Sequence, residues 1–237
     1  MSKTTIRVGA VAVTSVAVLV GLATSAGAAA PVSLSSVQAK AATAITLRVN
    51  DLNAAMARVS AAKNLGSGAA TLTAYLQNGI APLQALGQKI AADTTVSAAQ
   101  ADASTIFTNF RVLALVLPAA RLAADGDGII NGSVPTLTAD SAKAAARVSS
   151  SNEGTLDPLI TDLNAQISAA TNAASGISPT ALGYTPTQWN ANHALLSTER
   201  LADQTARNDI KQARSDLRQI SNFLKTDHAA ATPTTAS

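Results

Sequence analysis

One short segment of this chain combines an aromatic ring with several hydrogen-bonding side chains: Trp189, Asn190, Asn192 and His193. An aromatic face beside amide and imidazole groups can line a site for a small molecule or a glycan. The alternative is structural, because Trp189 would pack around the start of a helix and His193 would lie beside it on the same face. Both interpretations stay open, and Trp189, Asn192 and His193 are the candidate ligand-binding residues.

A second polar cluster, Asp125–Gly128, has the residue types of a calcium-binding loop. When Gly128 is aligned with the invariant glycine of such a loop, Ala123 falls at the first ligand position. Val134 then falls at the twelfth position, where calcium needs a bidentate glutamate. Two principal ligands are therefore missing, so we expect no metal site and interpret the segment as a flexible loop or helix stop.

Groups able to perform catalysis are few. The chain has two histidines and no cysteine, although serine and threonine are abundant. A Ser-His-Asp triad needs an oriented base and an oxyanion site, and no Gly-x-Ser-x-Gly elbow is present. We therefore expect no enzymatic activity, no catalytic residue and no cofactor. A hydrolase built from scattered Ser, Asp and His side chains is an alternative.

The charge balance argues against nucleic acid as a partner. Lys3 and Arg7 precede every acidic residue, and without them the 17 basic residues fall to 15 against 14 acidic ones. Nucleic-acid binding depends on clustered Lys and Arg that neutralise phosphates. Near the carboxyl end, Lys and Arg alternate with Asp and Glu, which is typical of a solvated helix face.

The first 28 residues have the pattern of a cleavable export signal. Lys3 and Arg7 supply the basic start, 8–22 is largely apolar, and Ala26-Gly27-Ala28 supplies small residues at a cleavage point. An uncleaved membrane anchor is the alternative, although the apolar run is shorter than the roughly 20 residues of a spanning helix. The apolar run 112–120 is also too short. We predict a signal peptide over 1–28, and membrane contact only through this leader before cleavage.

Alanine dominates the apolar residues, and aromatic residues make up 3% of the chain, which favours closely packed helices. Helices are expected over 37–64 and over 69–93. A third helix should begin at a Ser97–Gln100 capping box and continue into the apolar run 112–117, with a kink near Pro118. A short buried strand is the alternative for that run. The first helix has a heptad seam of Ala42, Ile45, Val49, Leu52, Met56 and Val59.

A loop is expected over 125–135, followed by a short helical segment over 138–148. Asp157 and Pro158 should begin a helix that ends at Gly176, with 178–183 as a linker. A Thr185–Gln188 capping box then opens the longest helix, 186–225. Its seam continues through an imperfect seven-residue repeat at 206–219, with Ala206, Ile210, Ala213, Leu217, Ile220 and Leu224 facing the core. Residues 29–228 should form one helical domain, and 229–237 a disordered tail.

Three features carry a resemblance to a known group: the segment 110–118, the run Thr185–His193 and the repeated Ala-Arg-x-Asp units. Together they resemble alanine-rich secreted helical proteins of actinobacteria, a group known only as uncharacterised. The resemblance spans most of the chain after the leader. It implies fold and export, and no functional residue can be transferred from it.

Together these patterns predict an all-α fold: an elongated, mostly antiparallel helical bundle of four main helices plus a short helical segment. The leading hypothesis is a secreted or cell-envelope protein without enzymatic activity that acts through its helical surface. The expected partner is an envelope protein or a glycan, and self-association is an alternative in which the seam of the last helix is left uncovered and pairs with a second copy of the chain. The alternative is a small-molecule or glycan-binding module around Trp189.

Overall fold

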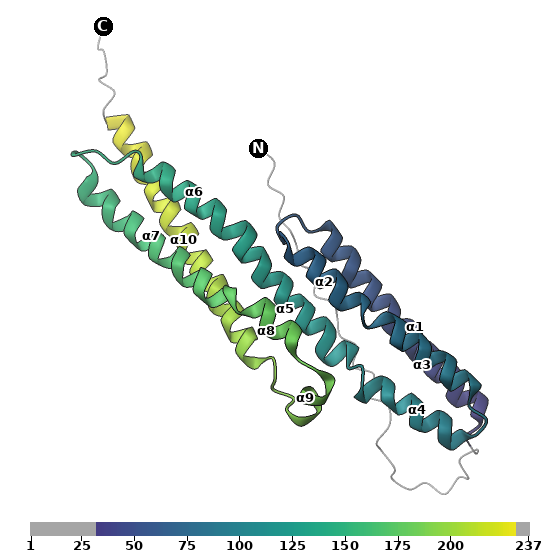
Figure 1. The fold of residues 1–237 in the computed structure, drawn as a ribbon. Coiled ribbons are helices and arrows are strands. Elements are labelled where there is room, and N and C mark those ends of the chain that lie inside the picture. The colour runs from purple at the N-terminus through teal and green to yellow at the C-terminus, as the bar shows by residue number, and fades with distance from the viewer. Residues whose placement is uncertain (1–31, 231–237) are drawn as a thin grey trace, which may run out of the picture. The chain divides into compact units, whose positions relative to one another are not determined.

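The computed structural model describes residues 32–230, with side chains through Thr226. The predicted signal peptide over 1–28 and the end of the chain from 231 lie outside the described residues. Within them the fold is all-α and no strand is present, so the predicted class is confirmed. Neighbouring helices run mostly antiparallel (Figure 1).

Four helices build the amino-terminal part: α1 (Leu34–Ala61), α2 (Gly68–Gln77), α3 (Ile80–Ala92) and α4 (Val96–Thr108). The first begins at Ser33, whose hydroxyl accepts from the backbone N–H of Ser36. Helix α1 packs against the other three around one hydrophobic core, and Gln38 ties it to α3 by donating to the carbonyls of Ile90, Ala91 and Asp93. This core includes Ile45, Leu52, Leu72, Leu76, Leu83, Ile90 and Ile106.

A continuous helical stretch follows: η1 (Val112–Val116), α5 (Leu117–Gly128), η2 (Ile129–Ser133) and α6 (Val134–Ala145), where η1 and η2 are π-helical turns. Pro118 and Pro135 each lie at the start of the α-helix after a π turn. The proline ring crowds the carbonyl four residues earlier, and a wider turn relieves that crowding. The apolar run is therefore helical, and the break lies earlier, at Arg111, whose φ is 46°.

The carboxyl-terminal part consists of α7 (Glu153–Ser175), α8 (Ile177–Gly183), α9 (Pro186–Ala191) and α10 (Ser197–Ala230). Helix α10 packs along α7, and α6 lies beside both (Figure 1). Ala206 and Ala213 of α10 are fully buried, and such small side chains let the helix backbones approach closely. A second hydrophobic core forms here, with Leu156, Leu163, Ile167, Ala170, Ile177, Trp189, Leu196 and Ile220 among its residues.

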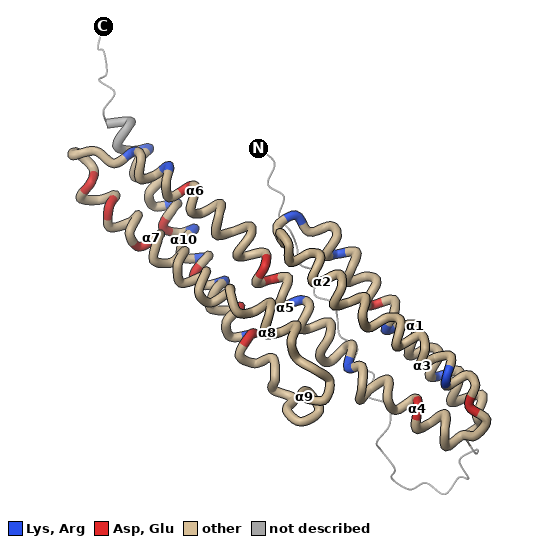
Figure 2. The backbone as a smooth tube through the Cα atoms, in the orientation of Figure 1, with Lys and Arg blue, Asp and Glu red and all other residues tan. Residues whose placement is uncertain are grey.

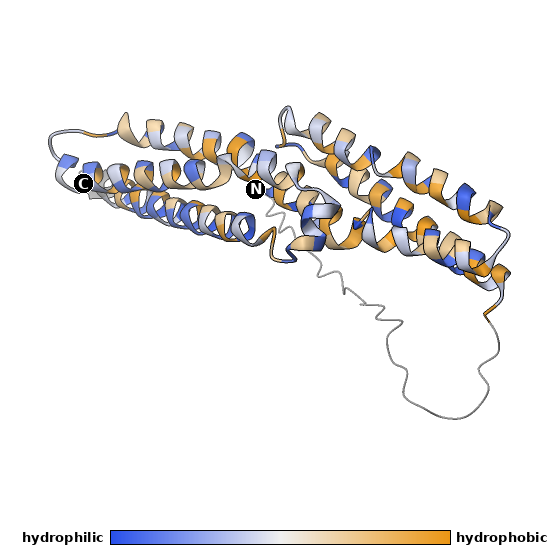
Figure 3. Ribbon diagram, turned by 60° about the horizontal axis from the view of Figure 1, so that its bottom comes forward, coloured by the Kyte–Doolittle hydropathy of each residue, from blue (hydrophilic) through white to orange (hydrophobic). Residues whose placement is uncertain are grey.

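Along the helices, the ribbon coloured by hydropathy alternates between hydrophobic and hydrophilic residues (Figure 3). Helix α5 contributes to both cores: Ala120 and Ala123 belong to the first, and Ala119 and Leu122 to the second. The predicted seam of α10 is confirmed for Ala206, Ile210, Ala213 and Ile220, whereas Leu217 and Leu224 are half-buried. In α1 the seam passes through Ala41 rather than Ala42, which is exposed.

Several predicted boundaries were wrong. The expected loop 125–135 is helical, and the expected linker 178–183 is helix α8. The predicted Ser97 cap is displaced to Thr95, whose hydroxyl accepts from the N–H of Ala98. Helix α7 begins at Glu153, so Pro158 lies inside it and not at its start. The second predicted helix, 69–93, breaks at 78–79. The last predicted helix, 186–225, breaks at 192–196, and its second part continues through Ala230.

Because 125–135 is helical, the apolar stretch is longer than the sequence indicated. Among the described residues, Val96–Ala145 is long and apolar enough to cross a membrane by length and composition, and 39% of its most apolar window is buried. A core helix of a soluble protein meets the same criterion, so this observation is weak evidence for a membrane span.

Candidate functional site

The Trp189 segment begins with the predicted capping box, which is confirmed. The backbone N–H of Gln188 donates to the Thr185 hydroxyl at 3.3 Å, and the Gln188 side-chain oxygen accepts from the Thr185 N–H at 2.8 Å. Trp189 itself is 9% exposed and belongs to the second core. The short helix α9 is therefore a rigid support for the residues that follow it.

The three candidate ligand-binding residues have different surroundings. His193 is exposed, and its ring lies nearly perpendicular to that of Trp189, at 86°, with the ring centroids 5.9 Å apart. Asn192 is exposed too, and its side-chain oxygen accepts from the N–H of Ala194 at 2.9 Å in the turn before α10. The structure brings Trp189 and His193 together but uses Asn192 in a local turn. These contacts favour the structural interpretation, and the ligand hypothesis stays a prediction.

Asn190 has a role that sequence reasoning did not assign. Its Nδ2 donates to the carbonyl of Thr108 at 2.9 Å, and its Oδ1 accepts from Arg111 Nε at 2.7 Å. These bonds join α9 to the last carbonyls of α4, where the chain bends through the left-handed conformation of Arg111. The polar groups beside Trp189 therefore stabilise a junction about 80 residues away in sequence. The only signal for this role was the polar character of Asn190.

Close packing explains two glycines of the expected loop. A Cβ at Gly126 would lie 3.1 Å from the Cβ of Ile177 in α8, and one at Gly132 would lie 2.8 Å from the Cβ of Asn64. Asp127 lies on the same stretch and accepts from the Ser178 hydroxyl at 3.2 Å, and burial raises its pKa. These residues therefore pack the long helix against neighbouring segments and do not form a calcium-loop geometry.

A charge network joins α5 to α10. Arg207 Nη2 lies 2.6 Å from Asp125 Oδ2, and Arg207 Nε donates to both oxygens of Asp203 at 2.9 and 2.8 Å. Arg121 lies near the same Asp125 oxygen at 3.8 Å. Burial raises the pKa of Asp125, and Arg207 partly opposes that shift. For Arg207, burial disfavours the charged form, but the two carboxylates outweigh it and raise the pKa.

Beside this network is a polar cavity of about 420 Å³ between α5, η2 and α10. Gly128 and Ser133 line one wall, and Arg207 and Arg214 line the other. Arg214 donates to the Ser133 hydroxyl at 3.3 Å. Among the described residues Arg214 has no carboxylate partner, in contrast to Arg207.

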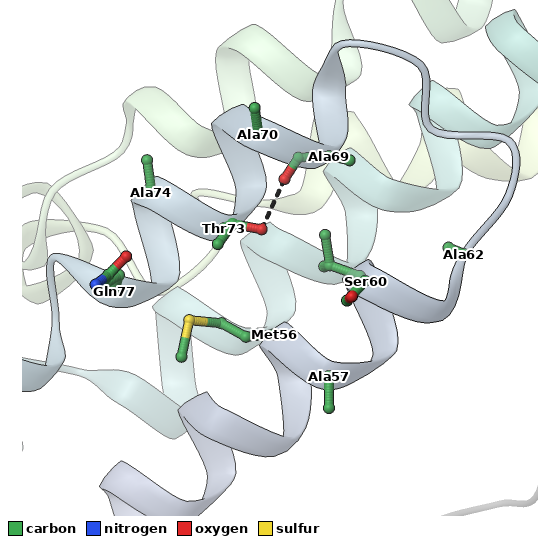
Figure 4. Close-up of a pocket in the computed structure, with 10 residues that line it drawn as sticks. Met56, Ala57, Ser60, Ala62, Ala69, Ala70, Thr73, Ala74 and Gln77 are labelled. Atoms are coloured by element: carbon green, nitrogen blue, oxygen red, sulfur yellow. Dashed lines mark hydrogen bonds between the residues drawn. The ribbon is translucent and has the colours of Figure 1, made fainter.

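A second concavity is a groove of about 790 Å³ along α1 and α2. Figure 4 shows that Thr73 lies on the side of α2 turned toward Met56 of α1, whereas the methyl groups of Ala70 and Ala74 point outward from α2. The Thr73 hydroxyl donates to the Ala69 carbonyl at 2.8 Å and so is occupied within its own helix. The other lining residues are Val59, Ser60, Ala62, Ala69 and Gln77. None of the lining side chains is charged.

Two buried carboxylates on α10 have one oxygen each without a partner. Glu199 is 5% exposed and accepts from the Tyr184 hydroxyl at 2.9 Å through Oε1. Asp216 is 2% exposed and accepts from Gln212 Nε2 at 2.8 Å through Oδ1. Glu199 Oε2 and Asp216 Oδ2 are buried with no hydrogen bond. Burial raises the pKa of Asp216, and the charge of Asp162 acts in the same direction.

Comparison of the chain with known protein families, curated proteins and solved structures finds no match. The resemblance to alanine-rich secreted helical proteins of actinobacteria therefore stays a prediction.

Proposed function

We propose that this protein is exported from a bacterial cell and works outside the cytoplasm as a non-enzymatic protein that binds a protein partner through its helical surface. The export half of the proposal rests on the sequence of 1–28, which has a basic start, an apolar core and small residues at the cleavage point. Determining the amino terminus of the extracellular protein tests it. A start within 29–31 supports export with cleavage, and a membrane-bound form that retains Met1 contradicts it.

The observation that carries the binding half is the α1–α2 groove. No charged residue occurs over 64–88, which includes all of α2 and most of α3, as the sparse colouring of these helices shows (Figure 2). Ala57, Ala70 and Ala74 are exposed within the groove. An uncharged, concave and largely apolar surface of this kind is therefore available at one face of the amino-terminal helices.

Such a surface suits a protein partner for two physical reasons. Charged residues are depleted at the centres of protein interfaces, because burying an unpaired charge is costly. Alanine side chains lose no rotamer entropy on burial, and their small size lets another helix approach closely. The low charge of the lining therefore favours a helical or apolar protein segment over a highly charged ligand.

The absence of enzymatic activity in this proposal rests on the scarcity of groups suited to catalysis. Cysteine is absent from the chain, and His193 is exposed beside a buried Trp189. The hypothesis of a glycan or small-molecule site around Trp189 has no supporting contact in the structure, since Asn190 and Asn192 are engaged in local and junction hydrogen bonds. We therefore propose no second function for that region.

Glutamate substitutions in the groove provide the test. Ala70 and Ala74 lie one helical turn apart on the wall of the groove, so the double variant Ala70→Glu/Ala74→Glu places two charges there. The matched control is Ala165→Glu/Ala169→Glu, which changes two exposed alanines with the same spacing on α7. We expect capture of a defined partner from medium, wall and membrane fractions by the wild type and the control, and its loss in the groove variant. Equal capture by both variants would contradict the proposal.

A further inference from the structure

We infer that the cavity between α5, η2 and α10 is a binding site for a small oxyanion, namely a phosphate or carboxylate group carried by a soluble molecule. Nothing in the proposed partner binding requires this site, because the cavity is formed by helices other than α1 and α2. The inference rests on the donors that converge there, on the space that is kept open, and on the local helix geometry.

The donors come from two elements. Arg214 has N–H groups left over after its contact with Ser133, at 3.3 Å, and no carboxylate of the described part of the chain pairs with it. The Ser133 hydroxyl accepts from Arg214 and can donate its own proton to a ligand. Guanidinium groups bind phosphate and carboxylate through paired N–H donors, which gives this pair the chemistry of an oxyanion site.

The charges around the cavity set where an anion would lie. Asp125 lines the same cavity and would repel an anion, but it is held by Arg207 at 2.6 Å. Arg207 also binds Asp203 and is therefore the more neutralised of the two arginines. The oxyanion is accordingly expected at the end formed by Arg214 and Ser133, with the remainder of the molecule directed toward Arg207.

Gly128 provides an independent argument. A glycine inside a helix costs about 0.5–1 kcal/mol relative to alanine. Gly126 and Gly132 are explained by close contacts, but a Cβ at Gly128 would meet nothing within 4 Å. Gly128 lines the cavity at the last residue of α5, next to the π turn η2. The missing side chain leaves this part of the cavity open.

The test uses the full exported chain and isothermal titration with three probes: inorganic phosphate, glycerol phosphate and succinate. The variants are Arg214→Gln, which removes the free guanidinium, and Gly128→Leu, which fills the cavity without changing its charge. The control Arg218→Gln removes an exposed arginine of the same helix that does not line the cavity. Far-UV circular dichroism and thermal unfolding confirm that each variant is folded.

We expect saturable binding of at least one probe at moderate ionic strength. Arg214→Gln should weaken it about tenfold or more, because a charge-assisted pair of hydrogen bonds is lost. Gly128→Leu should weaken it to a similar extent, and Arg218→Gln should leave it unchanged. Preference for glycerol phosphate over succinate would assign a phosphate ligand, and the reverse a carboxylate. The inference is overturned if no probe binds saturably, or if Arg218→Gln weakens binding as much as Arg214→Gln does.

Discussion

Asp216 offers the sharpest test of the packing between α7 and α10. Its side chain is almost fully buried, one oxygen accepts from Gln212 at 2.8 Å, and the other has no partner. A buried charged oxygen without a hydrogen bond costs about 1–3 kcal/mol or more. Asparagine keeps the accepting oxygen and the shape while it removes the charge. We therefore expect Asp216→Asn to raise the free energy of unfolding by about 1–2 kcal/mol near pH 7.

The stability difference between Asp216→Asn and the wild type should depend on pH. Burial raises the pKa of Asp216 in the folded protein above the ordinary value of an aspartate, so folding favours the protonated carboxyl. The corresponding stability is fully present below the unfolded-state pKa and is lost as the pH rises through the folded-state pKa. The advantage of Asp216→Asn should therefore shrink as the pH falls from about 7 to about 3.5. Burial also raises the pKa of Asp125 and Asp127, so each of these two groups should likewise contribute more to the stability of the folded state as the pH falls.

Urea unfolding followed by far-UV circular dichroism at several pH values measures both effects. Asp157→Asn is the matched control, because Asp157 is exposed on α7 and its charge does not act on Asp216, so its removal should change stability by about 0.5 kcal/mol or less. A loss of stability in Asp216→Asn near pH 7 would refute the reasoning. An unchanged difference between variant and wild type across the pH range would refute it as well.

The other predictions concern the junction, the helix glycines and the seam of α10. Asn190→Ala removes both side-chain bonds to the bend between α4 and η1 and should cost about 1–2 kcal/mol by urea unfolding, with increased hydrogen exchange around the bend. Gly126→Ala should destabilise the protein, because the added Cβ would lie 3.1 Å from the Cβ of Ile177. Gly128→Ala should raise the free energy of unfolding by about 0.5–1 kcal/mol, because nothing lies within 4 Å of its added Cβ. A lower melting temperature for Gly128→Ala than for Gly126→Ala would contradict this account of the packing. Ile220→Ala should lower the free energy of unfolding by about 2–5 kcal/mol, because Ile220 is 1% exposed. Leu217→Ala should lower it by less, because Leu217 is half-buried. Equal and small losses of stability in both variants would mean that α10 does not pack on α7.

Local signals in the sequence predicted the features that depend on neighbouring residues. The Thr185–Gln188 capping box and the Gly176 helix end are confirmed because their donors and acceptors lie within a few residues. The seam of α10 is confirmed at its small and branched positions, since a three-four periodicity places one face on the core. These elements needed no knowledge of the rest of the fold.

Features that depend on distant contacts could not be predicted. Gly126 and Gly132 are of a residue type that is typical of loops. In the structure they let Ile177 and Asn64, which lie far away in the sequence, approach the helix closely. The segment 178–183 has the same ambiguity, because its helix forms against α5. The long-range contacts of Asn190 with Thr108 and Arg111 could not be predicted either, and the ligand-binding role of Trp189, Asn192 and His193 stays a prediction.

Photo-crosslinking from the α1–α2 groove tests the central claim most directly. A photoreactive amino acid would replace Ala74 in the groove or, as the control, Ala169 on α7, each exposed in the described part of the chain. Both proteins would be irradiated in culture and the adducts compared by mass spectrometry. The proposal predicts a specific protein adduct from position 74 that is absent from position 169 and disappears when Ala70→Glu is added. Adducts that are the same from both positions, or none from position 74, would contradict binding through this groove.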